Sequence, residues 1–96
     1  MLNYPLSELT FNKNGKKPNI VLIVIDSWRY DTMNSDVSPN IHSFAQNAIV
    51  FDNHYSGGNS TRFGIFSLFY GIYGTYWHTI LSERKEPVFM ETLRKL

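Results

Sequence analysis

The sequence contains no cysteine. That absence excludes a disulfide scaffold, a zinc site built on thiolates and a cysteine nucleophile. Long apolar runs are also missing: the longest is Ile20–Ile25, six residues, whereas a membrane-crossing helix needs about 20. The sequence as it stands therefore predicts a soluble segment.

An excess of charge of one sign is absent too. Nine Lys and Arg oppose eight Asp and Glu, which leaves a net charge of +1. A nucleic-acid surface needs a clear basic excess, so no nucleic-acid partner is predicted. The apolar fraction of 43% and the aromatic fraction of 16% are instead typical of a globular chain. With 96 residues, the chain suffices for at most one small domain.

Two short apolar stretches carry the strand signal. The first, IVLIVI at residues 20–25, is rich in β-branched residues and apolar on both faces. This pattern favours a central strand of a parallel sheet covered by helices. The second, IVFDNHY at residues 49–55, is interpreted as another strand. Residues 1–19, which are polar and basic from 11 onward, are interpreted as a linker, and residues 20–96 as the domain.

Three segments are predicted to be helical. Residues 39–48 follow a candidate N-cap, Ser38, and their apolar residues share one helical face: Ile41, Phe44, Ala45 and Ala48. A helix is predicted from about Thr61 to Tyr70, and another from near Pro87 to the end. Residues 20–55 thus predict a right-handed βαβ unit. The expected fold class is α/β, an incomplete doubly wound sheet whose exposed strand edges favour self-association.

The chemistry-bearing residues follow the two predicted strands. Asp26 comes directly after the first, and the stretch SGGNSTRFG at residues 56–64 follows the second. Carboxyl ends of parallel strands lie at one edge of a sheet, so Asp26 and Thr61 are expected to meet. A carboxylate is a hard ligand for a divalent metal, and a hydroxyl at a helix N-terminus suits an anionic ester. A metal contacting both would activate the hydroxyl for attack.

Local roles stay open for the same residues. Asp26 could cap the turn after the strand, and Thr61 or Ser60 could be an ordinary helix N-cap. An aromatic stripe at helical spacing favours core packing over a lipid site: Phe63, Phe66, Phe69 and Tyr70. A receiver-like or nucleotide-binding α/β domain is a further alternative, but the phosphate-binding glycine motifs are missing.

The stretches PNIVLIVIDSWRYD, SPNIHSFAQNAIVFDNHYSGGNSTRFG and FSLFYG resemble the opening of a sulfatase-type domain of the alkaline phosphatase superfamily. The resemblance runs from about Pro18 to at least Gly71. It places Asp26 at a metal-ligand position, Thr61 at the threonine nucleophile of the lipid-modifying branch and Arg62 near the signature arginine. Counting back from Arg62 puts Gly58 where sulfatases convert a Cys or Ser to formylglycine, and glycine cannot be converted.

The resemblance implies a metal-dependent phosphoryl- or sulfuryl-ester hydrolase or transferase. A divalent metal (Mg, Mn, Ca or Zn) is implied for the full-length protein, and neither metal binding nor activity is expected of this segment alone. The implied location is the bacterial inner membrane, anchored upstream, with this segment in the periplasm. The implied partner is an envelope lipid or a lipid-linked phosphate or sulfate ester. The alternative is a non-catalytic domain that regulates lipopolysaccharide and envelope lipid balance.

Overall fold

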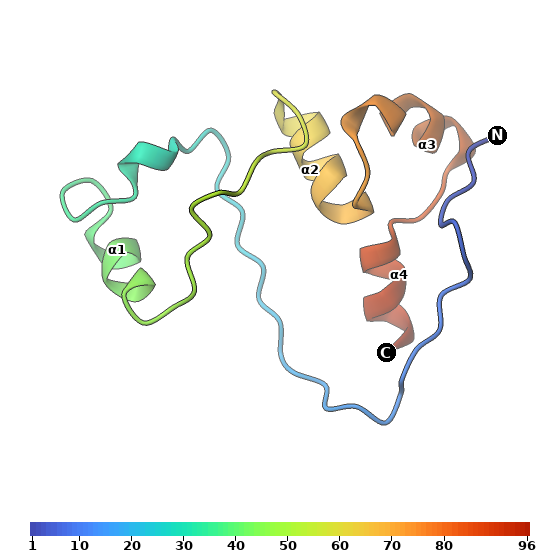
Figure 1. Ribbon diagram of the computed structural model, residues 1–96, viewed down its shortest axis with the longest axis horizontal. Coiled ribbons are helices and arrows are strands. Elements are labelled where there is room, and N and C mark those ends of the chain that lie inside the picture. The colour runs from blue at the N-terminus through green and yellow to red at the C-terminus, as the bar shows by residue number, and fades with distance from the viewer. The chain divides into compact units, whose positions relative to one another are not determined.

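The computed structural model describes all residues 1–96, and every regular element in it is a helix. Four α-helices and two short 3-10 helices follow one another along the chain (Figure 1): η1 Tyr30–Thr32, α1 Pro39–Ala45, α2 Thr61–Tyr70, η2 Gly74–Tyr76, α3 Trp77–Glu83 and α4 Val88–Lys95. They fall into two compact units. Residues 1–21 and 56–96 form one unit, and residues 22–55 form the other.

The predicted α/β class is wrong for this chain. Residues 20–25 have no regular secondary structure, residues 49–55 include a turn at Asp52 and Asn53, and neither segment is paired into a strand. A β-strand exists only where a neighbouring backbone accepts and donates its hydrogen bonds, and these segments have no such neighbour here. The side chains of Ile20–Ile25 accordingly stay 49–82% exposed. The prediction of a strand is therefore wrong for both segments.

The predicted helices agree better with the structure than the predicted strands do. Helix α2 has the predicted bounds, α4 begins one residue after Pro87, and α1 begins at Pro39 but ends at Ala45, three residues early. Helix α3 was not predicted. It follows η2 directly and ends at Glu83, and the next residue, Arg84, has the left-handed conformation (φ 51°) for which glycine is the usual signal. The sequence therefore marked neither end of α3.

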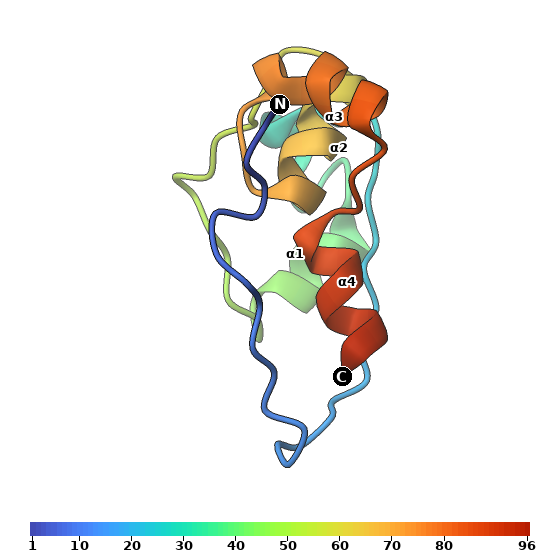
Figure 2. The same ribbon diagram turned by 90° about the vertical axis from the view of Figure 1, so that its right-hand side faces the viewer.

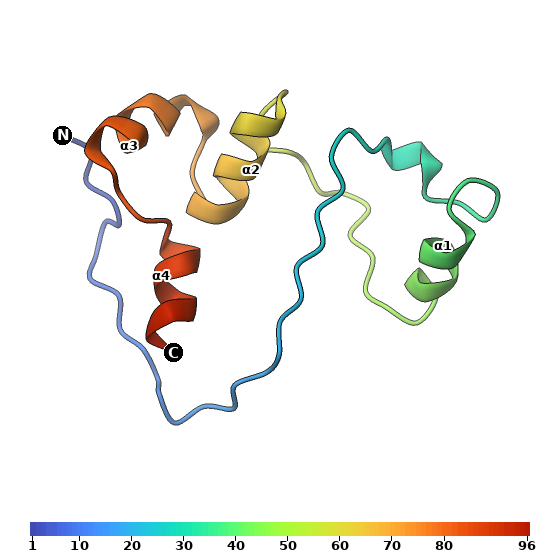
Figure 3. The same ribbon diagram turned by 180° about the vertical axis from the view of Figure 1, so that it is seen from behind.

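The first unit is built around α2. Phe66 of α2 and Ile80 of α3 are its buried apolar residues, 3% and 4% exposed. The Phe66 ring stacks on Tyr70 at 4.6 Å and meets Trp77 edge-on at 5.8 Å between centroids. Of the predicted aromatic stripe, Phe66 is buried in the core, whereas Phe63, Phe69 and Tyr70 are half-buried, so the expectation of core packing holds only in part. Figure 3 shows α2 and α3 joined through η2, with α4 below them.

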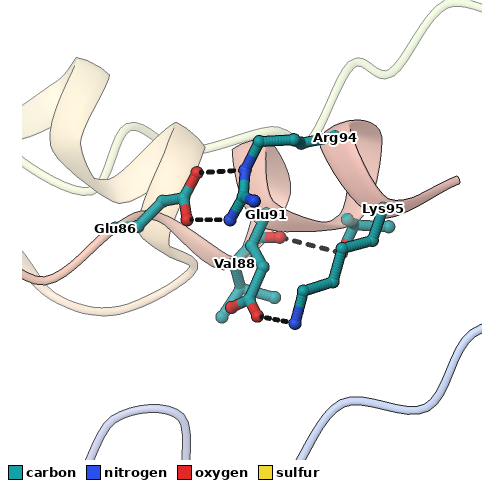
Figure 4. Close-up of polar contacts among 6 residues, drawn as sticks. Glu86, Val88, Glu91, Arg94 and Lys95 are labelled. Carbon is teal, nitrogen blue, oxygen red and sulfur yellow. Dashed lines mark hydrogen bonds and ion pairs between the residues drawn. The ribbon is translucent and has the colours of Figure 1, made fainter.

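Helix α4 is held by polar contacts along its exposed side (Figure 4). Arg94 donates two hydrogen bonds to the Glu86 carboxylate, at 3.3 and 2.7 Å, and Lys95 donates one to Glu91 at 2.6 Å. The Arg94 guanidinium lowers the pKa of Glu86 below its usual value. Such exposed pairs are screened by solvent and contribute little to stability, so α4 depends mainly on its packing against α2.

The second unit, residues 22–55, has no buried residue. Its hydrogen bonds are mostly local: Asn34 accepts from the backbone N–H groups of Asp36 and Val37, and Ser38 donates to the Thr32 carbonyl at 2.8 Å. The predicted N-cap Ser38 holds that position in α1, but its hydroxyl bonds to the preceding turn rather than to the helix. This unit is shaped by turns rather than by a core.

Candidate functional site

Thr61 is the first residue of α2, and Ser60 is its N-cap. The sequence offered Thr61 or Ser60 as the N-cap of this helix. The structure places Ser60 at that position, although the Ser60 side chain makes no capping hydrogen bond. The first bond of the helix joins the Gly64 N–H to the Ser60 carbonyl at 2.9 Å. The preceding backbone N–H groups point out of the helix end, where the helix dipole favours an anion.

The glycine loop lies tightly on the helix that follows it. A Cβ atom at Gly57 would lie 2.1 Å from Ser67 Oγ, and one at Gly58 would lie 2.4 Å from Phe63 Cβ. Real Cβ atoms do not approach other atoms so closely, so only glycine fits here without a shift. The two glycines thus let the loop lie directly against α2, and a side chain at position 58 would meet Phe63.

Arg62 lies next to Thr61 and is held by an aromatic face. Its guanidinium carbon lies 5.6 Å from the centroid of the Trp77 ring, within the range of a cation–π contact. No Asp or Glu forms an ion pair with Arg62 in the structure. A guanidinium that keeps its charge beside a helix N-terminus suits a phosphate or sulfate ester.

An apolar groove adjoins Thr61 and Arg62 within the first unit. It has a volume of about 410 Å³, and its lining side chains come from α2, α3 and the start of α4: Thr61, Arg62, Ile65, Phe66, Phe69, Tyr70, Trp77, Pro87 and Met90. Sequence reasoning missed Trp77 and Met90. The spacing of Trp77, Ile80 and Leu81 along one helical face was the available signal for Trp77.

Asp26 lies in the other unit and is exposed. Its Oδ1 accepts the backbone N–H of Ser27 at 2.9 Å, and Ser27 has a positive φ of 55°. This is the local turn role that the sequence left open beside metal ligation. Because Asp26 and Thr61 belong to different units, their predicted meeting stays a prediction.

The donors present do not by themselves make a metal site. Asp26 and Thr61 supply oxygen atoms of the kind that Mg²⁺ and Ca²⁺ prefer, but those ions take six or more ligands. Nowhere in residues 1–96 do three or more His, Asp or Glu side chains gather as a candidate metal cluster. Any metal held by these two residues would need ligands from beyond them.

Each helix is too short or too polar to span a lipid bilayer. No solved structure matches the chain. Among curated proteins, an uncharacterized protein of Haemophilus influenzae is 39% identical over 93 residues, which is 97% of this chain. Proteins named "Inner membrane protein YejM" from Salmonella typhimurium and Salmonella typhi are each 36% identical over 94 residues, which is 98% of this chain.

This chain spans only 16% of the length of each of these relatives, so it corresponds to a small part of a longer protein. The family described as Sulfatase matches residues 18–96, which include Asp26, the glycine loop and all of α2. That match covers well over half of the chain. The chain therefore belongs to the sulfatase family.

Proposed function

We propose that this chain is part of a phosphoryl- or sulfuryl-ester hydrolase or transferase in which Thr61 is the nucleophile. The observation that carries the proposal is the position of Thr61. Its hydroxyl stands at the first residue of α2, beside Arg62 and at the positive end of the helix dipole. The hydroxyl oxygen would attack the phosphorus or sulfur, the bond to the ester oxygen would break, and the leaving alcohol would take up the hydroxyl proton, while Arg62 binds the non-bridging oxygens. Water or an acceptor alcohol would then release the group from Thr61.

Metal dependence is part of this proposal. Asp26 and Thr61 would contribute two oxygen ligands, and further ligands would come from outside these residues. When bound, a divalent ion would favour the deprotonated hydroxyl. The formylglycine route is excluded by Gly58, because glycine cannot be converted and a Cβ there would collide with Phe63.

The substrate class follows from the groove. An ester bound at Thr61 and Arg62 would lay any alkyl chain into a groove lined by Phe69, Tyr70 and Met90. An amphiphilic ester, such as an envelope lipid with a phosphate or sulfate group, fits both features. We further propose that the whole protein lies in the bacterial inner membrane with this segment in the periplasm; the name of two relatives, inner membrane protein, supports the membrane part of this proposal.

The test uses a protein that contains this segment at the length of its relatives. Thr61→Ala should abolish hydrolysis of 4-nitrophenyl phosphate, 4-nitrophenyl sulfate and decyl phosphate, and Thr61→Ser should keep part of it. Ser60→Ala is the neighbouring control and should change turnover by less than about threefold, because the Ser60 side chain makes no capping bond. Unchanged turnover in Thr61→Ala would remove Thr61 from the mechanism.

A second function is a non-catalytic domain that regulates lipopolysaccharide and envelope lipid balance through lipid or protein partners. The groove favours it, since an alkyl chain can bind there without any reaction. Decyl phosphate that shifts the Met90 methyl resonance but is never hydrolysed would support this alternative.

We also propose that the chain self-associates. Because no strand edge is present, the contact would be made by the exposed apolar side chains of residues 20–25, and monomeric sedimentation at high concentration would contradict it.

A further inference from the structure

The hydroxyl of Tyr4 joins the ends of two helices that are far away in sequence. It donates to the carbonyl of Tyr70, the last residue of α2, at 2.8 Å. It also accepts the backbone N–H of Val88, the first residue of α4, at 3.0 Å. Both are groups that a helix end leaves without an intrahelical partner. One side chain therefore links the C-terminus of α2 to the N-terminus of α4.

The ring of Tyr4 adds a second link to α2. It lies 5.6 Å from the ring of Tyr70, tilted by 46°. The Tyr70 hydroxyl in turn donates to the Lys85 carbonyl at 2.7 Å, in the connection between α3 and α4. Burial raises the pKa of both tyrosines above the usual value, so both hydroxyls stay protonated and able to donate.

The contacts on either side of Tyr4 extend the attachment. The backbone N–H of Leu2 donates to Glu83 Oε1 at 3.0 Å, and Lys85 donates its ammonium to the Leu2 carbonyl. Farther along, the Lys95 ammonium lies 5.4 Å from the centroid of the Phe11 ring. Residues 2–11 thus contact the end of α3, the start of α4 and the end of α4, and Figure 2 shows this segment running beside α4.

We propose that residues 2–11 are an intramolecular strap that binds the α2–α4 surface and sets the width of the apolar groove. The groove is lined by Tyr70, whose carbonyl Tyr4 holds, and by Pro87, the neighbour of Val88. Phe69 on α2 and Met90 on α4 also line it. Releasing the Tyr4 hydroxyl would let α4 move away from α2 and would change the groove directly.

This proposal goes beyond the proposed function, because it requires no substrate and no reaction. It names an interaction surface whose partner is the chain's own N-terminal segment, and it makes Tyr4 a positioning residue. A segment interpreted from sequence as a linker becomes a part of the folded unit. The two proposals are tested independently. Unchanged turnover in Thr61→Ala would not contradict the strap, and evidence against the strap would not bear on the role of Thr61.

The decisive variant is Tyr4→Phe, which keeps the ring and removes the hydroxyl. The matched control is Tyr55→Phe, since Tyr55 is 84% exposed and lies in the other unit. Amide exchange and methyl spectra of the labelled chain are compared. In Tyr4→Phe the Val88 amide should exchange about tenfold faster, because its acceptor is gone, and the Met90 methyl and Trp77 indole signals should shift. In Tyr55→Phe all three should match the parent chain.

Unchanged Val88 exchange and unchanged Met90 and Trp77 signals in Tyr4→Phe would overturn the strap. A Val88 effect without any change at Met90 and Trp77 would overturn its control of the groove. Should Tyr4→Phe fail to fold, Glu83→Gln tests the same idea more gently by weakening the hold on Leu2. Smaller shifts at the same Met90 and Trp77 signals are then expected, and their absence would count against the proposal.

Discussion

The two units of the chain share a composition rich in apolar residues but use it differently. In residues 56–96 the aromatic side chains of α2 pack on one another and on α3, and Phe66 is 3% exposed. In residues 22–55 the apolar face of α1 stays largely exposed, with Ile41 at 38% and Phe44 at 77%. A helix pattern therefore predicts that a helix forms, but it does not reveal whether its face finds a partner.

The largest expected difference between the units comes from removing one ring in each. Phe66→Ala should cost about 3–5 kcal/mol, because it empties the small core beneath Tyr70 and Trp77. Phe44→Ala should change the free energy of unfolding by less than about 0.5 kcal/mol, because the ring is exposed. Urea unfolding of both variants measures this contrast. An equal loss of unfolding free energy in the two variants would show that the Phe44 ring is buried against another part of the protein in solution.

A smaller effect separates two glycines of the first unit. Gly58→Ala places a Cβ 2.4 Å from Phe63 Cβ and should destabilise the chain by about 1–3 kcal/mol. Gly15→Ala meets its nearest neighbour, the Asn12 carbonyl oxygen, only at 3.7 Å, and should be neutral or slightly stabilising. Urea midpoints of the two variants give the comparison. A neutral Gly58→Ala would mean that the glycine loop does not pack on α2 in solution.

The smallest effect concerns pH. The Leu2 N–H lowers the pKa of Glu83 below its usual value of 4.5, and the Lys85 ammonium at 3.3 Å adds to this. Because the folded pKa lies below the unfolded one, this contribution is complete above about pH 4.5 and is lost as pH falls through the folded pKa. Acid titration should therefore release Leu2 in the parent chain, as amide exchange of Leu2 would report, but change little in Glu83→Gln. The same acid sensitivity in both would assign the effect to other carboxylates.

The sequence predicted structure correctly where the signal lies within one segment. It failed where the structure depends on contacts with a distant part of the chain or with another chain. Helix α2 was predictable because its cap and its apolar spacing both lie within the segment, and the structure ends it at Gly71 with a left-handed φ of 68°. The strands were not, since Ile20–Ile25 needs a neighbouring backbone. Trp77 and Tyr4 were missed because their roles come from residues far away in sequence.

The same distinction between local and distant signals applies to the candidate site. Thr61 and Arg62 could be proposed from the motif, and the structure adds the Trp77 face and the groove beside them. The joining of Asp26 to Thr61 depended on a sheet that these residues do not form on their own. That part of the site has to be tested by experiment, starting from Thr61→Ala.

The packing of Gly58 on Phe63 also constrains how this sequence could change over time. A cysteine at position 58 would be the first requirement for a formylglycine enzyme, yet its Cβ would meet Phe63 Cβ at 2.4 Å. The atom it meets is the Cβ that every residue except glycine carries, so a smaller side chain at position 63 would not remove the clash. A side chain at position 58 therefore requires the glycine loop to move away from α2.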